Sequence, residues 1–300
     1  MKHINKTTSV SLEAERKLND WRDNFVYQRH NYSEHLPTNT QYNGKKFNEL
    51  CNSGMTTPNL WDLHGGDAAA VYTRKLLKVD LAKEQDSLCC YCCDTLEGED
   101  AEKDFNDVLE HFLDKGSDRC GKMYTYKNLL LACHGNRHKF VRTERGDTWA
   151  ILAARFNTTE NALRSEVKNS HLPSSLAHGT KVKIPNLPQH CDVTKWQHPI
   201  NINPVTDVDC WKKFIYKSDG SIQGINKDAQ DVVKKLELDV DKFRERRKEV
   251  WDLAKQAYGE DEYVQIHIEK RDIQAIFDYF KCDAFCVVYW AYFAKQLNIS

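Results

Sequence analysis

The sequence lacks the features that mark secreted and membrane proteins. Residues 1–18 contain no apolar core of the length that a secretory signal needs. The longest apolar run, residues 284–294, is about half as long as a membrane span. Charge of neither sign dominates, because 43 Lys and Arg stand against 44 Asp and Glu. We therefore expect a cytoplasmic protein with no membrane contact and no global positive field that would draw it to nucleic acid.

The composition is that of a folded chain with uneven charge. Aromatic residues make up 11% of the chain and charged residues 29%, which argues against wholesale disorder. A length of 300 residues predicts two domains, or one large domain with an insertion. Residues 97–110 have seven carboxylates against one lysine, whereas residues 115–145 have eight Lys or Arg against two acids. The basic block indicates an anion-facing surface, although such blocks are also common as solvated faces.

Apolar spacing predicts helices toward both ends of the chain. Near the start, Ala14, Leu18, Trp21 and Phe25 recur at helical intervals. Between the first two helices, residues 32–66 are rich in Asn, Thr, Gly and Pro and predict a loop. The expected helices cover residues 14–25, 68–83, 243–257, 269–281 and 283–297. A hairpin over residues 214–222 is expected to turn at Asp219 and Gly220.

Residues 143–186 have a pattern of their own. Residues 146–148 are expected to cap a helix over residues 149–156, and Thr159 to cap a second helix. The helix expected over residues 149–156 has an apolar face of Ile151, Leu152 and Phe156. Residues 179–185 alternate as a short strand. The Gly-Asp-Thr start and the Gly-x-x-Val-x-Ile-Pro ending resemble the LysM family of small modules with the order βααβ, which implies binding of an N-acetylglucosamine polymer.

Eleven cysteines are the most informative count in this sequence. In a cytosolic chain, cysteines at this density indicate metal ligands rather than disulfides. Cys89 and Cys92 form a Cys-x-x-Cys pair, and removal of residues 135–189 brings Cys133 and Cys191 to the same spacing. Four thiolates in two such pairs suit a closed, tetrahedral zinc site. We expect these four cysteines to bind one structural zinc ion that takes no part in chemistry.

The other cysteines have alternative interpretations. Cys90 and Cys93 flank the first pair, so a shift of the zinc ligands to these two residues is an alternative. The remaining cysteines are interpreted as small buried hydrophobic residues: Cys51, Cys120, Cys210, Cys282 and Cys286.

Further motifs accompany the two cysteine pairs. The chain reads Leu-Cys-Cys-Tyr-Cys over residues 88–92, Glu-His-Phe over residues 110–112, Tyr-Lys-Asn-Leu-Leu-Leu-Ala-Cys over residues 126–133 and His-Cys-Asp-Val-Thr-Lys over residues 190–195. This order resembles the HNH endonucleases, a family built on a ββα-metal core. It is most similar to the PtuB-type subgroup, the nuclease subunits of Septu-type anti-phage systems. The resemblance covers most of the chain except the LysM-like insert, and it implies an ABC-type ATPase (PtuA-like) as the partner.

The resemblance implies a role for each polar residue of these motifs. His111 is the expected general base, because imidazole accepts a proton near neutral pH. Asn128 would hold that imidazole through a side-chain hydrogen bond. Glu110 and Asp192 are the expected ligands of a catalytic Mg²⁺ or Mn²⁺, since carboxylates suit these cations. Lys195 is expected to contact a substrate phosphate.

Each of these residues also has a plainer explanation. His111 would serve equally as a structural histidine or a zinc ligand, and Asn128 as a turn residue. Asp192 would also serve as a helix cap. Asn136 competes with Asp192 for the metal position, because it begins an Asn-x-x-Lys motif of its own.

The sequence thus predicts an α+β protein with a zinc-stapled ββα core surrounded by helices. The expected parts are an N-terminal helical region (residues 1–85), a discontinuous nuclease core (residues 86–142 and 187–225), the LysM-like insert (residues 143–186) and a C-terminal helical region (residues 226–300). The expected function is metal-dependent cleavage of nucleic acid, with DNA favoured, in anti-phage defence. The alternatives are an RNA (tRNA) nuclease of a retron-type system, and a non-catalytic zinc-scaffolded protein that binds through the LysM-like module.

Overall fold

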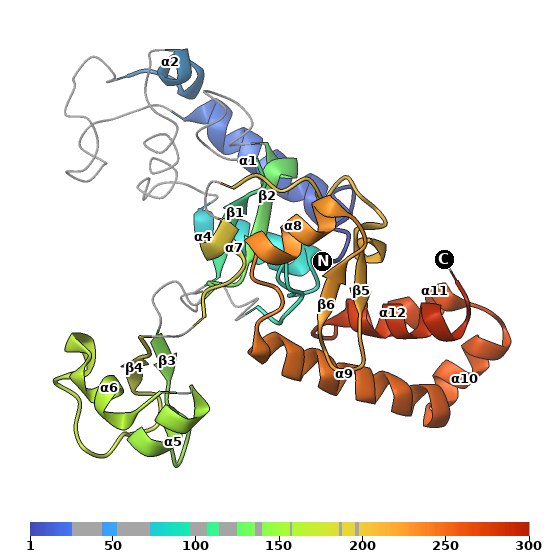
Figure 1. Ribbon diagram of the computed structural model, residues 1–300. Helices are drawn as coiled ribbons and strands as arrows, with labels where there is room; N and C mark the ends of the chain where they lie inside the picture. Colours follow the sequence, from blue (N-terminus) through green and yellow to red (C-terminus); the bar gives the residue numbers. More distant parts are fainter. Residues whose placement is uncertain are drawn as a thin grey trace.

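The computed structural model has a mixed α+β architecture, in agreement with the expected fold class (Figure 1). Among the residues that it describes, the strands form three two-stranded antiparallel sheets. The structure describes residues 1–25, 44–52, 73–96, 107–113, 125–135, 140–156, 158–185, 188–195 and 198–299.

The regular elements follow one another along the chain as mostly short pieces. The α-helices are α1 (Ser9–Asn24), α2 (Phe47–Asn52), α4 (Arg74–Glu84), α5 (Trp149–Arg155), α6 (Glu160–Ser165), α7 (Asp192–Lys195), α8 (Lys227–Lys235), α9 (Asp241–Glu260), α10 (Glu262–Glu269), α11 (Ile273–Tyr279) and α12 (Cys286–Gln296). The 3-10 helices are η5 (Tyr126–Asn128), η6 (Val167–Asn169) and η7 (Cys210–Lys213). The strands are β1 (Val108–His111), β2 (Leu129–Ala132), β3 (Phe140–Arg142), β4 (Lys181–Lys183), β5 (Phe214–Tyr216) and β6 (Ile222–Gly224).

Helix α1 forms where its apolar spacing predicts it. The side chain of Thr8 caps the helix by accepting a hydrogen bond from the Ser11 amide at 3.1 Å. The predicted face is buried at Ala14, Leu18 and Trp21. This face packs against α4, so the two helices form one layer beside the first sheet.

Two expectations for the region before the first sheet need correction. The helix expected over residues 68–83 begins at Arg74 within the described residues, where the Thr73 side chain caps it. The loop expected over residues 32–66 contains the short helix α2. Apart from residues 44–52, that stretch lies outside the described residues.

A buried ion pair joins the start of the chain to α4 and β2. The Lys6 ammonium donates to the Glu84 carboxylate and, at 2.8 Å, to the Leu129 carbonyl. Glu84 also accepts a hydrogen bond from the Ser11 hydroxyl. Since a buried charge is tolerated only when it is paired and hydrogen-bonded, this contact fixes how the three segments meet.

Strands β1 and β2 carry the two central sequence motifs. In their antiparallel register, His111 lies opposite Leu129. All four residues of β2 are buried. The Gln85 side chain covers the outer edge of β2 by exchanging two hydrogen bonds of 2.8 Å with the Leu131 backbone. An edge strand inside the protein thereby keeps its polar groups satisfied.

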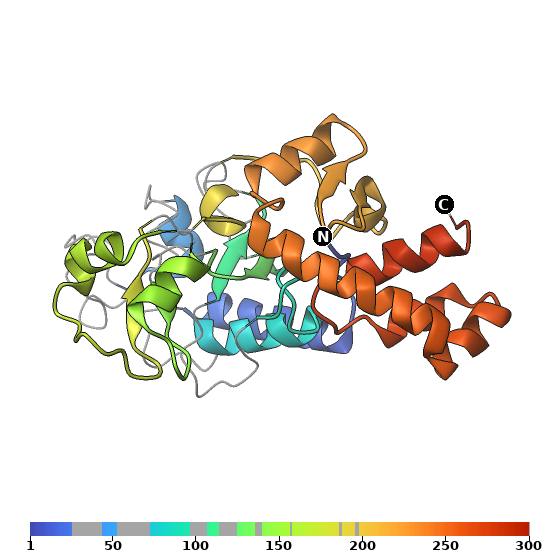
Figure 2. The same ribbon diagram turned by 60° about the horizontal axis from the view of Figure 1, so that its bottom comes forward.

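The chain returns to this sheet at α7 after the excursion through residues 140–185. The His190 amide donates to the Gly135 carbonyl at 3.2 Å, so the segment before residues 140–185 crosses the segment after them in direct contact. Gly135 has a φ of +58°, and a Cβ there would lie 2.1 Å from the His190 carbonyl oxygen, so this crossing requires glycine. Helix α7 thereby lies beside strands β1 and β2 (Figure 1 and Figure 2).

Residues 140–185 form a small unit with the order β3, α5, α6, β4. Its two helices are capped as expected, because Thr148 accepts from the Ile151 amide and Thr159 from the Ala162 amide. The unit has a hydrophobic cluster separate from the main core, made of Trp149, Leu152, Ala153, Leu163, Val182 and Ile184. Figure 1 shows this unit at one end of the molecule, away from α9 to α12.

Two details of this unit differ from the sequence-based expectation. The pairing of β3 with β4 begins at Phe140, three residues before the expected boundary at residue 143. Ile151, expected on the apolar face of α5, is 46% exposed, and Ala153 is buried in its place. On so short a helix, the neighbouring strands decide which side chains are buried. The helical periodicity of the sequence alone does not show where those strands lie.

The C-terminal part contains the expected hairpin and, with α8 and α10, two helices more than expected. Strands β5 and β6 pair, and Gly220 occupies the turn with a φ of +80°. Arg247 of α9 donates to the Gly220 carbonyl at 2.6 Å and to the Leu238 carbonyl at 2.7 Å, which joins this hairpin to the helices. Helix α10 was not predicted, because Asp261 both ends α9 and caps the next helix.

Helix α12 contains most of the apolar run noted in the sequence, and its residues pack within the main core. Over the described residues, no helix is both long enough and apolar enough to cross a membrane.

The paired ends of residues 140–185 predict that this unit is removable. Phe140 and Lys183 are register partners, so a short Gly/Ser linker in place of residues 140–185 spans the gap without pulling Cys133 away from Cys191. We expect this variant to retain its zinc and the thermal unfolding of the main core. Metal analysis and calorimetry of the purified variant provide the measurement.

The matched positive control is Gly135→Ala, which disturbs the crossing itself and is expected to reduce zinc retention. A linker variant that is folded but holds no zinc would show that the unit is part of the metal-binding core.

Candidate metal centre and catalytic site

The four cysteines expected to bind zinc come together in the structure. The Sγ atoms of Cys89, Cys92, Cys133 and Cys191 all lie within 4.8 Å of one another. Three of these residues are buried and Cys133 is half-buried. Within the described part of the chain, no separate group of three or more Cys, His, Asp or Glu residues is this close. Four sulfur donors at this spacing suit zinc, so these residues could hold a structural metal ion.

The first cysteine pair lies in a tight loop that the backbone closes. Leu88 and Thr95 form an isolated antiparallel bridge, and the Cys93 amide donates to the Cys89 carbonyl at 3.0 Å. The Cys133 amide lies 3.3 Å from the Cys89 sulfur. Backbone amides that point at sulfur stabilise thiolates, so the loop is organised for thiolate ligands.

The structure also settles which cysteines of the cluster face one another. Cys90 and Cys93 are not members of the four-sulfur group, so the alternative register is wrong. The Cys90 amide donates instead to the Leu131 carbonyl at 3.1 Å, which docks the loop on β2. The Cys93 carbonyl accepts from the Phe285 amide at 2.7 Å, which anchors the start of α12.

The remaining cysteines divide between the core and the surface. Cys210 and Cys286 are buried, as expected for small hydrophobic residues, whereas Cys282 is exposed and that expectation is wrong. Cys282 falls in the short turn between α11 and α12, where no apolar periodicity applies. The side chains of Cys51 and Cys120 lie outside the described part of the structure.

Burial opposes the ionisation of the thiols in the sulfur cluster. Burial raises the pKa of Cys92 and of Cys191 well above the ordinary thiol value. Burial also opposes ionisation of Cys89, but hydrogen bonds from the neighbouring thiols hold its pKa well below the ordinary value. A divalent cation would offset the cost of several buried thiolates, and its binding would release protons.

His190 is a contact of the cluster that sequence reasoning left without a role. Its Nδ1 lies 3.3 Å from the Cys191 sulfur and 3.7 Å from the Cys133 sulfur. The ring packs edge-on against Phe243 at 4.6 Å between centroids. Burial lowers the pKa of His190 to about 4, so the imidazole is neutral at physiological pH. Its position directly before Cys191 was the available signal.

Glu110 is the centre of a buried polar network that joins β1, the cysteine loop and α7. The Tyr91 hydroxyl donates to Glu110 Oε1 at 2.6 Å, and the Lys195 ammonium donates to the same oxygen. Lys195 also donates to the His111 carbonyl at 3.1 Å. Because Tyr91 lies in sequence between Cys89 and Cys92, two members of the sulfur cluster, the network links that cluster to the expected catalytic residues.

The charge state of Glu110 reflects this environment. Burial raises the pKa of Glu110 to about 8, and its hydrogen bond with Asp192 acts in the same direction, while Lys195 opposes both. Burial likewise raises the pKa of Tyr91 well above its ordinary value, so that residue remains a hydrogen-bond donor. The two neighbouring carboxyl groups are those of Glu110 and Asp192, and Lys195 is the cation paired with Glu110. Two carboxyl groups this close favour the binding of positive charge.

His111 and Asn128 lie at the same end of the first sheet. His111 ends β1 and is buried, and Asn128 directly precedes its register partner on β2. The Asn128 side chain accepts from the Leu113 amide at 2.7 Å and donates to the Leu113 carbonyl at 3.3 Å. Asn128 therefore holds the backbone that follows His111. Its expected hydrogen bond to the imidazole stays a prediction.

The expected metal and phosphate ligands occupy the start and end of α7. Asp192 is the first residue of that helix and hydrogen-bonds to Glu110. Two carboxylates fit Mg²⁺, which is commonly held by one or two carboxylates together with water and substrate phosphate. Lys195 is 4% exposed and paired with Glu110, so its contact with a substrate phosphate also stays a prediction. Asn136 lies outside the described residues.

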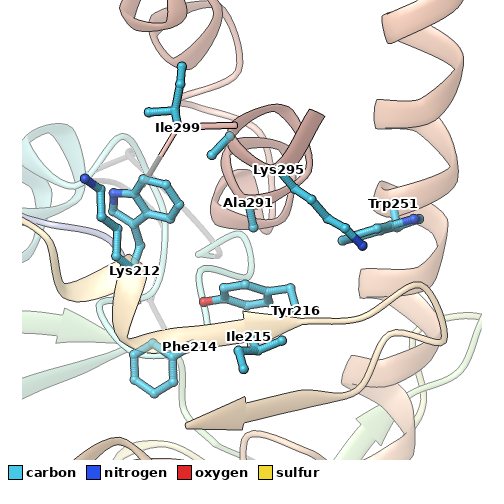
Figure 3. A pocket seen from close by; sticks show the side chains of 10 residues that line it. Lys212, Phe214, Ile215, Tyr216, Trp251, Ala291, Lys295 and Ile299 are labelled. Atoms are coloured by element: carbon cyan, nitrogen blue, oxygen red, sulfur yellow. The ribbon is translucent and has the colours of Figure 1, made fainter. Parts of the chain in front are cut away.

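A separate pocket of about 290 Å³ lies between the β5 hairpin, α9 and α12 (Figure 3). Trp211, Tyr216 and Trp251 line it with several aliphatic residues, and Lys212 and Lys295 are its charged residues. Its described lining includes no carboxylate, histidine or cysteine. The charged groups of this pocket are therefore cationic, in contrast to the Glu110 network, which contains two carboxyl groups.

A scan against protein-family models finds no match to this chain, and a search of curated proteins finds none either.

The convergence of the four sulfurs predicts one zinc ion per chain. We expect elemental analysis of purified protein to find one zinc, and Cys133→Ser to lose it. Since the ligands come from three distant segments, the binding free energy of a structural zinc, about 10–16 kcal/mol in zinc-finger peptides, would also stabilise the fold. Chelation should therefore lower the unfolding temperature sharply.

Cys90→Ala is the matched control, because Cys90 neighbours a ligand without joining the cluster. It is expected to keep a full equivalent of zinc. Loss of zinc in the control but not in Cys133→Ser would contradict the ligand set.

The raised pKa of Glu110 predicts pH-dependent stability. Its folded-state pKa of about 8 exceeds the ordinary value of 4.5, so the folded protein keeps a proton that the unfolded chain releases between these values. The contribution of this carboxyl to stability is thus fully present below about pH 4.5 and is lost as the pH rises through about 8. Glu110→Gln retains an acceptor for Tyr91 but does not titrate. Denaturant unfolding should show that wild-type protein loses more stability than this variant between about pH 5 and 8.

Glu249→Gln, a change at an exposed position of α9, is the control and should follow the wild-type pH dependence. Parallel curves for wild type and Glu110→Gln would mean that the Glu110 carboxyl is ionised in the fold.

Proposed function

We propose that this chain is a metal-dependent endonuclease of the HNH type. The observation that carries the proposal is the joint placement of Glu110 and His111 on β1, Asn128 directly before β2 and Asp192 at the start of α7. Four cysteines hold these elements together. The resemblance noted in the sequence assigns chemistry to the same residues, and their proximity in the fold supports it.

His111 is the proposed general base. It would take a proton from a water molecule, whose oxygen then attacks the phosphorus while the bridging oxygen of the nucleic-acid backbone leaves. Such proton transfer typically contributes about 10²- to 10⁴-fold to rate. Asn128 supports this role by fixing the backbone at Leu113, two residues after His111, through two hydrogen bonds. A general base has to be held in direction as well as in place.

Glu110 and Asp192 would hold the catalytic Mg²⁺ or Mn²⁺. When bound, that cation supplies charge stabilisation for the phosphoryl oxygens and the leaving oxygen. Lys195 positions Glu110 by donating to its carboxylate from the other end of α7. Tyr91 restrains the same carboxylate at 2.6 Å. The two donors leave the carboxylate little freedom to turn away from Asp192.

The proposed biological setting is anti-phage defence beside an ABC-type ATPase partner, with DNA as the favoured substrate. A net charge of −1 gives the chain no general affinity for a polyanion, which suits a subunit that acts within a complex. RNA is the alternative substrate, because the same base and metal ligands serve either backbone.

The test of the proposal is His111→Ala. We expect it to lower nucleic-acid cleavage by about 10²- to 10⁴-fold while zinc content and unfolding temperature stay at wild-type values. Cleavage of labelled duplex DNA, single-stranded DNA and tRNA is measured with Mg²⁺ and with Mn²⁺, with and without an ABC-type ATPase of the proposed partner class.

His198→Ala is the matched control, since His198 is exposed and is none of the candidate site residues. Wild-type cleavage by His111→Ala would remove His111 from the mechanism. If neither wild type nor variant cleaves, but both bind one ligand equally, the non-catalytic binding protein is the better description.

A further inference from the structure

The β3–β4 pair carries two positive charges side by side. Arg142 and Lys181 are direct partners in the antiparallel register. Val141 and Val182, the next pair along, pack against the hydrophobic cluster of this unit. Because side chains alternate between the faces of a strand, Arg142 and Lys181 both point away from that cluster, and both are exposed.

Like charges placed directly opposite one another on a strand pair are destabilising. Within the described residues, no acid forms an ion pair with Arg142 or Lys181. Arg142 donates to the Gly179 carbonyl at 3.2 Å, which holds its guanidinium near the turn before β4. A fold tolerates such a pair at small cost, but an anion that binds both groups would turn the repulsion into a favourable contact.

The charge inventory of the whole unit shows the same excess. Residues 140–185 contain seven Lys or Arg against four Asp or Glu. All four acids already form ion pairs with only three of the basic residues, Arg155, Arg164 and Lys183. Within the described part of the chain, the other four basic residues form no ion pair and are exposed: Arg142, Arg145, Lys168 and Lys181.

The basic strand pair lies close to the candidate catalytic site along the chain. Phe140 begins β3 five residues after Gly135, whose carbonyl accepts a hydrogen bond from the His190 amide just before α7. Five residues span at most about 18 Å when fully extended. One strand of nucleic acid has a phosphate about every 3.4 Å along the duplex axis, so a few nucleotides would bridge both places.

We propose that the β3–β4 face, with Arg142 and Lys181 at its centre, binds the phosphate backbone of the nucleic acid on which this chain acts. This inference rests on the proposed nuclease function and adds a substrate-binding surface to it. The excess of positive charge on an otherwise balanced chain is the feature that favours a polyanion over a neutral glycan. The contact is independent of base sequence, because phosphates carry the same charge everywhere.

The test is the double change Arg142→Gln with Lys181→Gln in the full chain, in the His111→Ala background so that the probe is not cut. The probe is a fluorescent DNA duplex of about 20 base pairs, titrated over a range of NaCl concentrations. Each lost phosphate contact reduces the slope of log K against log salt by about 0.9. For two contacts, the affinity loss between about 50 and 200 mM salt should be about tenfold smaller in the variant.

Two further readouts separate binding from a structural role. Removal of two facing positive charges should leave the unfolding temperature unchanged or raise it. Lys255→Gln with Lys270→Gln makes the same change in net charge at exposed positions of the C-terminal helices, and should leave the salt slope unaltered. An effect of this control equal to that of the strand variant would mean that only net charge matters, and would overturn the proposal.

Unchanged duplex affinity and salt slope in the strand variant would also overturn it, even where the His111 experiment supports cleavage. Binding of N-acetylglucosamine oligomers that the double change abolishes, with duplex affinity unaffected, would assign the face to a glycan instead. Conversely, a reduced salt slope with wild-type cleavage by His111→Ala supports the surface while contradicting the proposed base.

Discussion

The convergence of four sulfur atoms is the constraint on which the rest of the structure depends. Their residues come from the loop after α4, the end of β2 and the residue before α7. Bringing such distant segments together costs chain entropy, and burying their thiols costs hydration. A metal ion held by the four sulfurs would offset both costs at one point. The direction in which β2 ends and the place where α7 begins follow from that point.

The metal centre and the candidate catalytic residues share their backbone. Tyr91 stands between two ligands and donates to Glu110, and Cys191 directly precedes Asp192. A shift of either cysteine pair would therefore move a carboxylate of the proposed site. Through this coupling, a closed metal site that performs no chemistry would still determine the geometry of the proposed catalytic residues, as outer residues do around catalytic metals.

The unit at residues 140–185 is inserted at a sensitive position, between the third and fourth sulfur ligands. Two features make the insertion tolerable. Its ends are register partners on β3 and β4, and its buried side chains form a cluster separate from the main core. The close contact between Gly135 and His190 then keeps Cys133 and Cys191 together, as they would be without the inserted residues. The insertion also places an excess of positive charge beside a core that has none.

The sequence by itself determined the features that depend on neighbouring residues. The spacing of Ala14, Leu18 and Trp21, the Thr148 and Thr159 caps, the hairpin at Gly220 and the matching of the two Cys-x-x-Cys pairs were all legible, because each depends on short-range periodicity or turn chemistry. That covered the α+β class, most helices and the grouping of two Cys-x-x-Cys pairs at one site. It did not cover the choice between Cys89 with Cys92 and the neighbouring Cys90 with Cys93, since both pairs have the same spacing.

Tertiary structure alone decided how the polar residues of the candidate site are connected. Lys195 and Glu110 are 85 positions apart, and Glu110 and Tyr91 are 19 apart, so no local pattern relates them. The same holds for the exposure of Ile151 and Cys282, which depends on what the fold places next to them. Local sequence specifies which face of an element is apolar. Only the packed chain specifies which buried polar groups meet, because each of them has to find a partner among distant segments.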